Sequence, residues 1–119
     1  MLLAMPVDTT HSPALRGRLL HGLSDPSRLL ILDELRPGET RVSELVERTG
    51  LSQPNASKHL ACLWGCGLVA REKRGREVYY WLIDGVDELL SAADGVLDRA
   101  GESVGACRLS DEAAEGECC

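Results

Sequence analysis

Apolar residues recur with a helical period along the first part of the chain. Leu15, Leu19, Leu20 and Leu23 fall on one stripe of an expected helix over residues 13–23. A second helix is predicted from Asp25-Pro26, because Asp is a favoured N-cap and Pro is favoured at the first helical position. Pro37-Gly38 is expected to stop this second helix.

The next apolar and polar positions predict two helices separated by a tight turn. Residues 43–49 form the first, and Gly50 is expected to be its C-cap. Ser52 then caps a helix over residues 53–64, which is polar at its start and apolar from Leu60 onward. Two helices joined by a short turn that contains glycine are typical of a helix-turn-helix.

A strand-like pattern follows, and then a long amphipathic one. Residues 68–73 and 77–83 are rich in β-branched and aromatic side chains, with a turn at 74–76, and this predicts a two-stranded wing. The last helix begins at Asp84 or Gly85. It carries one apolar stripe: Val86, Leu89, Leu90, Ala93, Val96, Leu97 and Ala100. We interpret this stripe, with the first helix, as a dimer seam; the alternative is that it packs on the subunit's own core.

These elements predict a mainly α-helical protein with a β-hairpin, which is the winged helix-turn-helix class, as a homodimer through its first and last helices. We expect a flexible arm over residues 1–12. A DNA-binding and dimerisation domain follows over 13–101, and a cysteine-containing tail over 102–119.

Composition supports a single soluble domain in the cytoplasm. The chain has 119 residues, of which 44% are hydrophobic and 27% charged. No apolar run approaches the roughly 18 residues of a membrane span, and residues 1–13 do not resemble a secretory signal. We therefore expect no membrane partner and a cytoplasmic location.

The charge distribution favours a nucleic-acid partner for one part of the chain. The net charge is −6, yet residues 52–76 hold five basic residues and one acid. The N-terminal half of a recognition helix meets base edges, and Gln and Asn can bind adenine. A hairpin tip can reach the DNA backbone or minor groove. The residues that we expect to contact double-stranded operator DNA are Ser52, Gln53, Asn55, Ala56, Ser57, Lys58, His59, Lys73, Arg74 and Arg76.

The chain has five cysteines, which are candidate metal ligands. An odd number of thiols in a cytoplasmic chain argues against a disulfide framework. Cys62 and Cys66 are four residues apart, so they share one helical face and can share one thiophilic ion. Two ligands hold a metal poorly, and Cys107 is the candidate third ligand. Cys118 and Cys119 are less favoured, because adjacent cysteines rarely both join one tetrahedral site.

Several segments together resemble the ArsR/SmtB family of metal-responsive repressors, over roughly residues 14–101. They are the run from Leu23 to Leu32, Val42-Ser43-Glu44-Leu45, Gln53-Pro54-Asn55-Ala56-Ser57-Lys58-His59-Leu60, Gly67-Leu68-Val69, and Gly75-Arg76-Glu77-Val78-Tyr79-Tyr80. The resemblance implies a homodimer that binds its operator when metal-free and leaves it when metal binds.

The metal-ligand pattern is most similar to the cadmium- and lead-sensing CmtR type. Cys62-Leu63-Trp64-Gly65-Cys66 matches the motif of that type, and Cys107 matches its tail ligand. The last helix offers Asp84, Asp87, Asp94 and Asp98 but no histidine, which disfavours the class with His and Asp ligands there. The inducer implied is cadmium or lead, with mercury or zinc as alternatives.

Three other functions could use parts of the same pattern. A thiol-redox repressor would use the same cysteines, with oxidation in place of metal binding. An enzyme is not expected, because no orienting carboxylate accompanies His59 and the cysteines, and no small organic substrate is implied. A metal-buffering protein is not expected, because that function would not need a recognition helix and a wing.

Overall fold

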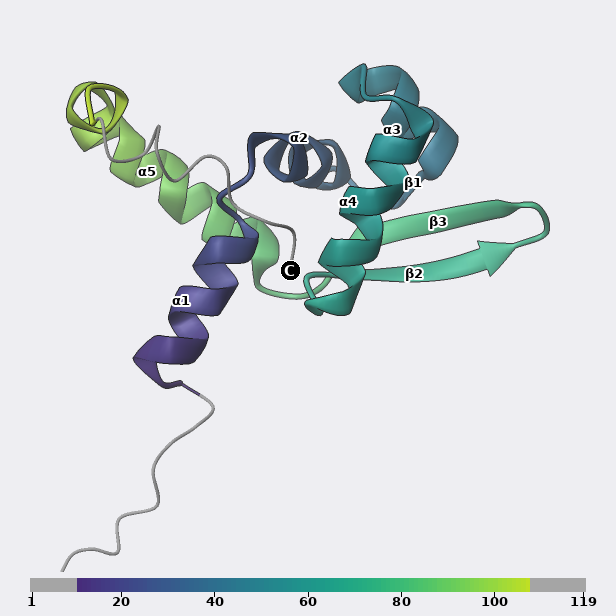
Figure 1. Cartoon of the computed structure of the whole chain (residues 1–119), viewed down its shortest axis with the longest axis horizontal. Coiled ribbons are helices and arrows are strands. Elements are labelled where there is room, and N and C mark those ends of the chain that lie inside the picture. The colour runs from purple at the N-terminus through teal and green to yellow at the C-terminus, as the bar shows by residue number, and fades with distance from the viewer. Residues whose placement is uncertain (1–10, 108–119) are drawn as a thin grey trace, which may run out of the picture.

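The computed structural model describes residues 11–107. Helices and strands follow one another in the order expected of a winged helix-turn-helix (Figure 1). They are α1 (Pro13–Gly22), α2 (Pro26–Leu35), β1 (Thr40–Arg41), α3 (Val42–Thr49), α4 (Gln53–Gly65), β2 (Val69–Arg74), β3 (Glu77–Leu82) and α5 (Val86–Gly105).

Local capping explains where the central helices begin and end. Asp25 Oδ2 accepts a hydrogen bond from the backbone N–H of Arg28 at 3.0 Å and so caps α2. Ser52 Oγ accepts from the N–H of Asn55 at 3.2 Å at the start of α4. Gly50 ends α3 in the left-handed conformation, with φ of 76°. These caps are the ones that the sequence predicts.

The sheet is antiparallel, with the strand order β1-β3-β2. The wing is the β2–β3 hairpin, in which Val69 pairs with Leu82 and Arg74 pairs with Glu77. The sequence analysis did not predict β1. This two-residue strand pairs Thr40 with Tyr80 and therefore joins the start of α3 to the base of the wing.

One hydrophobic core holds α2, α3, α4 and the base of the wing together. It consists of Leu23, Ile31, Leu32, Leu35, Leu45, Leu60, Leu63, Leu68, Val69, Tyr80, Val86 and Leu90. Figure 1 shows α3, α4 and the wing on one side of α2, and α1 and α5 on the other. The core thus fixes the recognition elements to one another and leaves α1 and α5 at the opposite end. None of the helices over residues 11–107 is both long and apolar enough to span a bilayer.

Helix α5 differs from expectation in its length and in how much of it the core covers. It continues to Gly105, so residues 102–105, which we expected in the tail, are helical. Val86 and Leu90 are buried in the core, while Val96 and Leu97 are 56% and 49% exposed. The apolar stripe therefore divides into a part that packs on its own subunit and a part that faces outward.

Candidate DNA-binding face and thiol site

The exposed side chains of α4 lie where a recognition helix would meet DNA. Ser52, Gln53, Ser57 and Lys58 are exposed and Asn55 is half-buried, so five of the predicted DNA-contacting residues on this helix remain available. Lys58 takes part in no ion pair within residues 11–107. The helix N-terminus adds unpaired N–H groups that favour phosphate.

Two of the residues predicted to contact DNA, Ala56 and His59, are buried or largely buried in the structure. Ala56 is fully buried, so it supports the core and cannot reach a base. The side chain of His59 is only 12% exposed, and its Nδ1 lies 3.8 Å from Asp25 Oδ2 at the start of α2. That buried nitrogen has no hydrogen-bond partner. His59 therefore packs between α4 and α2 instead of facing solvent.

The basic residues of the wing are not equivalent. Arg74 donates to both carboxylate oxygens of Glu39, at 2.9 and 2.8 Å, and it also pairs with Glu72 and lies over the Tyr79 ring. The hydrogen bond to Glu39 raises the pKa of the Arg74 guanidinium and lowers the pKa of the Glu39 carboxyl. Within residues 11–107, Lys73 and Arg76 form no ion pair. Of the three, Lys73 and Arg76 are the better placed to bind phosphate.

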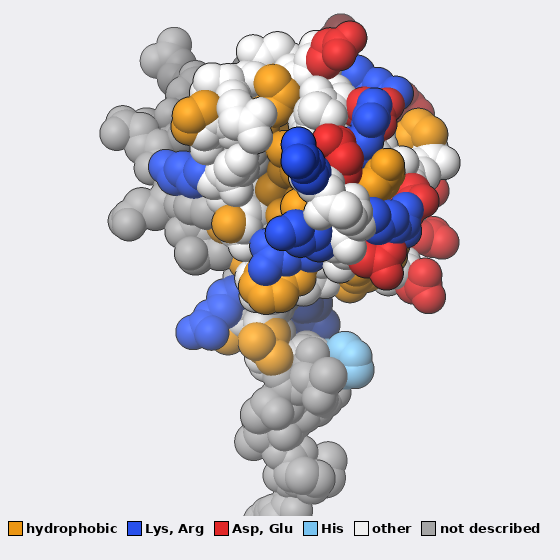
Figure 2. Space-filling model, turned by 90° about the vertical axis from the view of Figure 1, so that its right-hand side faces the viewer, with side chains coloured by type: hydrophobic (Ala, Val, Ile, Leu, Met, Phe, Trp, Pro, Cys, Tyr) orange, Lys and Arg blue, Asp and Glu red, His pale blue; other side chains and the backbone are white. Residues whose placement is uncertain are grey.

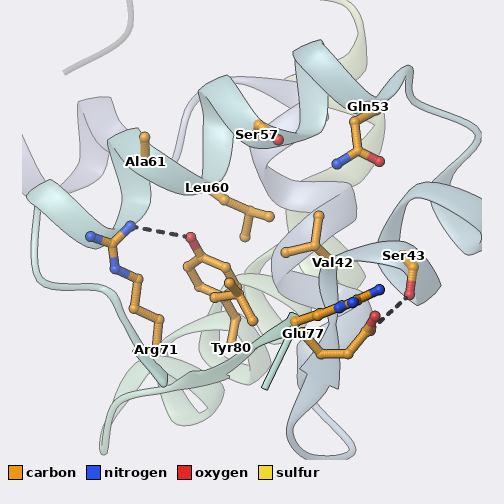
Figure 3. A pocket seen from close by; sticks show the side chains of 11 residues that line it. Val42, Ser43, Gln53, Ser57, Leu60, Ala61, Arg71, Glu77 and Tyr80 are labelled. Atoms are coloured by element: carbon orange, nitrogen blue, oxygen red, sulfur yellow. Dashed lines mark hydrogen bonds between the residues drawn. The ribbon is translucent and has the colours of Figure 1, made fainter. Parts of the chain in front are cut away.

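A polar groove lies between the recognition helix and the wing (Figure 3). Gln53, Ser57 and Ala61 line it from α4, while Arg71 and Arg76 line it from the wing, and its volume is about 510 Å³. Figure 2 views the molecule from the side that is on the right in Figure 1; several Lys and Arg side chains lie across the middle of this face, with many of the acidic side chains along its right edge. Helix and wing can therefore contact one duplex together.

Arg71 fixes the angle between the groove's two walls. Its guanidinium lies over the Trp64 ring at 3.8 Å and donates to the Tyr80 hydroxyl at 3.5 Å. A cation–π contact of this kind, between the end of α4 and β2, is worth about 0.5–1 kcal/mol at an exposed site. The sequence analysis counted Arg71 as basic charge and did not identify this role.

Cys62 and Cys66 lie together at the C-terminal end of α4. The N–H of Cys66 donates to the carbonyl of Cys62 at 3.0 Å, which places them on successive turns of one helix face. Cys62 is buried and Cys66 is exposed. Both are disulfide-bonded in the structure, so each sulfur lies within bonding distance of another sulfur. When reduced, this end of α4 offers soft thiolate donors, which suit a thiophilic ion.

The third proposed ligand, Cys107, is exposed and follows the C-terminal end of α5. Figure 1 shows that end of α5 well separated from the end of α4. Over residues 11–107 of one subunit, no group of three or more metal-ligating side chains comes together. The remaining candidates, Cys118 and Cys119, lie outside the described residues.

Two aspartates of the last helix, Asp87 and Asp94, are bound to an arginine at the end of α2. Arg36, at the end of α2, donates to Asp87 Oδ1 at 2.6 Å, to Asp94 Oδ2 at 3.2 Å and to Ser91 Oγ at 2.6 Å. These contacts join α5 to α2.

Comparison with known proteins decides the family. Residues 25–71 match the model for the bacterial regulatory proteins of the arsR family. The protein described as "Probable mercury resistance operon repressor" of Streptomyces lividans is 35% identical over 113 residues, which cover 95% of this chain and 81% of that protein. The chain belongs to the ArsR/SmtB family. CmtR of Mycobacterium tuberculosis is 45% identical over 68 residues, 57% of this chain and 58% of CmtR.

Solved structures of ArsR-type proteins share the fold. The homodimeric winged helix-turn-helix DNA-binding domain from Mycobacterium bovis superposes with a TM-score of 0.70 at 30% identity, covering 85% of this chain and 95% of that one. NolR from Sinorhizobium fredii superposes with a TM-score of 0.67 at 29% identity, covering 80% and 96%. The predicted winged helix-turn-helix class is confirmed. Members of the ArsR/SmtB family are DNA-binding transcriptional regulators, and this chain is one of them and not an enzyme.

Proposed function

We propose that this ArsR/SmtB protein is a cytoplasmic homodimeric repressor that leaves its operator when a thiophilic metal ion binds cysteine thiolates. The observation that carries the DNA-binding half is the exposed polar start of α4 beside a wing that bears Lys73 and Arg76 outside ion pairs. Two such units in a dimer would reach successive major grooves of a near-palindromic site.

An apolar groove between α1, α2 and α5 supports the dimer. Its volume is about 400 Å³, and it is lined by Leu20, Leu23, Leu29, Leu89, Leu90, Ala92, Ala93 and Val96. Leu15, Leu19 and Leu20 of α1 are exposed, as are Val96 and Leu97 of α5. Contiguous apolar surface on two adjacent helices marks an interaction site. The mycobacterial domain that shares this fold is homodimeric, which favours a second copy as the occupant.

The donor set at the end of α4 supports a thiolate metal site. Cys62 and Cys66 provide two soft ligands on one helix face. Since Cys107 is separated from them in its own subunit, we propose that Cys107 of the partner subunit completes the site. Three thiolates favour cadmium or lead, and mercury accepts two or three.

Metal binding in this arrangement would tie the end of the recognition helix to the other subunit. Cys62 and Cys66 are in the last turns of α4, so a displacement of either residue by a bound metal would also displace the recognition helix. The DNA-competent dimer would then lose population. By linkage, DNA weakens metal binding by the same factor. Relatives named for mercury resistance and as CmtR support a metal inducer in general.

One observation favours a redox repressor as the second candidate. Cys62 and Cys66 are disulfide-bonded in the structure, and their oxidation could also shift the end of α4. In this alternative, reduction and oxidation of the two thiols would exchange the DNA-binding and released states without metal.

The test is a parallel titration of the reduced protein on DNA from its own promoter with cadmium, lead, mercury and zinc. Fluorescence anisotropy reports release, and near-ultraviolet thiolate charge-transfer absorbance reports ligation. We expect one ion per subunit, release by at least one ion, and loss of both signals in Cys62→Ser.

Two further arms separate the candidates. Cys107→Ser should weaken metal binding and release, and Cys118→Ser, which removes a less favoured candidate ligand, should weaken both to a smaller extent. Mixed dimers, with Cys107→Ser in one subunit and Cys62→Ser in the other, report whether the site forms across subunits. Release by peroxide with no response to any ion would discard the metal sensor in favour of the redox repressor.

A further inference from the structure

Arg28 is a buried charge in α2 for which the sequence analysis assigned no role. Its side chain is 1% exposed. Within residues 11–107, no carboxylate forms an ion pair with its guanidinium. A buried guanidinium needs partners for its donors, because its desolvation is costly. Its hydrogen-bond partners therefore show which parts of the structure this side chain connects.

The guanidinium connects the thiol site to the end of α1. Its Nε donates to the Gly22 carbonyl at 2.6 Å, and one terminal nitrogen donates to the His21 carbonyl at 3.4 Å. The other terminal nitrogen lies 3.7 Å from Cys62 Sγ and donates to it. A single rigid fork thus holds a sulfur of α4 and two carbonyls of α1 at once.

Helix α1 depends on this contact for its position. Among its own residues only Gly22 is buried, so side-chain packing on the subunit's core contributes little. The carbonyls at a helix C-terminus carry partial negative charge, which a cation stabilises. Arg28 therefore serves as the charged cap of α1, with the Ser24 hydroxyl as a second donor to the His21 carbonyl at 2.7 Å.

The second cysteine also borders α1. Cys66 lines a cavity of about 560 Å³ with Ala14, Gly17, Arg18 and His21, all of them from α1. Both cysteines of the proposed sensor site therefore border α1, Cys62 through Arg28 and Cys66 across this cavity.

We propose that Arg28 is the positioning residue that transmits the bonding state of Cys62 to α1. This inference rests on the proposed function, in which α1 forms part of the dimer seam. In this structure the Cys62 sulfur is disulfide-bonded, and exchange of that bond for a thiolate or a metal bond changes the position of the sulfur and its capacity to accept a hydrogen bond. Because the guanidinium is rigid, a shift of the sulfur that it contacts also changes its hydrogen bonds to the Gly22 and His21 carbonyls. The end of α1 then moves, and with it the spacing of the two recognition helices.

The test compares Arg28→Lys with Arg36→Lys in the full chain, using the metal that releases the wild-type protein, or peroxide if none does. Lysine keeps the charge but cannot span three acceptors. Arg36 is the matched control, because it ties α2 to α5, the other helix of the proposed seam, and touches neither cysteine. For each variant, metal affinity of the free protein and DNA affinity before and after loading are measured.

We expect Arg28→Lys to bind metal and DNA separately within about tenfold of wild type. The factor by which loading weakens DNA binding should fall from the roughly 5–150-fold typical of allosteric proteins to within about twofold of unity. Arg36→Lys should retain the wild-type factor. A wild-type factor in Arg28→Lys would overturn the inference alone, while a wild-type protein that responds to neither metal nor peroxide would overturn the proposed function.

A second measurement requires no variant and guards against misfolding of Arg28→Lys. The Nε–H of a buried arginine can be followed by ¹⁵N NMR in the wild-type dimer. On metal loading or on oxidation, we expect the Arg28 Nε–H resonance to shift together with the backbone amides of residues 21–24. An Arg28 resonance that stays in place while the amides of Cys62 and Cys66 shift would show that the guanidinium does not follow the sulfur.

Discussion

At the scale of single residues, the helix caps could be predicted from the sequence, whereas the burial of some helical residues could not. Asp25, Gly50 and Ser52 cap their helices as predicted, because a cap depends on residues within one turn of it. These positions could be assigned from a few neighbouring residues alone.

The residues misassigned or missed are those whose burial depends on which face a helix turns inward. Ala56 precedes the buried Leu60 and Leu63 by four and seven residues, so it continues their stripe. Arg28 stands in the same relation to Leu32 and Leu35. The spacing of the apolar residues indicates burial at both positions. The polar residues around Ala56 and the charge of Arg28 indicate the opposite, so neither residue is predicted to be buried.

The left-handed conformation of Gly50 gives a prediction at this scale. Gly50→Ala should reduce the free energy of unfolding by about 1–2 kcal/mol, because a Cβ is disfavoured at φ of 76° even though open space surrounds it. Gly65→Ala is the matched control, since that helical glycine has ordinary φ and equally open surroundings. Urea unfolding at one protein concentration compares them. Equal midpoints for the two variants would mean that the conformation of Gly50 is not constrained by the turn.

At the scale of elements, the wing was predicted but its attachment was not. Strand β1 has two residues, too few for any periodicity, and it is held by pairing with β3. The ion pair between Arg74 and Glu39 is also long-range, since the partners are 35 positions apart in the sequence. Both contacts anchor the wing to the segment before α3, and neither leaves a local pattern.

The different environments of the wing's basic residues predict different effects on DNA binding. Lys73→Gln and Arg76→Gln should each weaken operator binding and reduce the slope of log K against log salt by about one, as expected for one lost phosphate contact. Arg74→Gln should change the slope much less, because its guanidinium already pairs with Glu39 and Glu72. Anisotropy titrations across a salt series provide the slopes. A larger loss of slope in Arg74→Gln than in Arg76→Gln would show that DNA breaks these ion pairs.

At the scale of the whole molecule, one amphipathic helix serves two surfaces. The sequence predicted a single stripe on α5 and left open whether it packs on its own core or on a partner. The structure shows the first two turns on the core and leaves Val96 and Leu97 exposed beyond it. A periodic pattern reports that a face is apolar, but it does not report what covers that face, and only the arrangement of α1, α2 and α5 distinguishes the two parts.

This division predicts that DNA affinity can be lost without any change in the recognition helix. Leu97→Glu places a charge on the outward part of α5, so the dimer should dissociate while each subunit remains folded. Since linkage of two half-site contacts raises affinity by roughly 10²–10⁴-fold, operator binding should weaken by at least about 100-fold. Leu30→Glu is the control, because Leu30 is exposed to nearly the same extent, at 48%, and lies on α2, away from the outward part of α5. Sedimentation velocity gives the oligomeric state, circular dichroism the fold, and anisotropy the affinity. A Leu97→Glu protein that stays dimeric, or a Leu30→Glu protein that dissociates equally, would place the seam elsewhere.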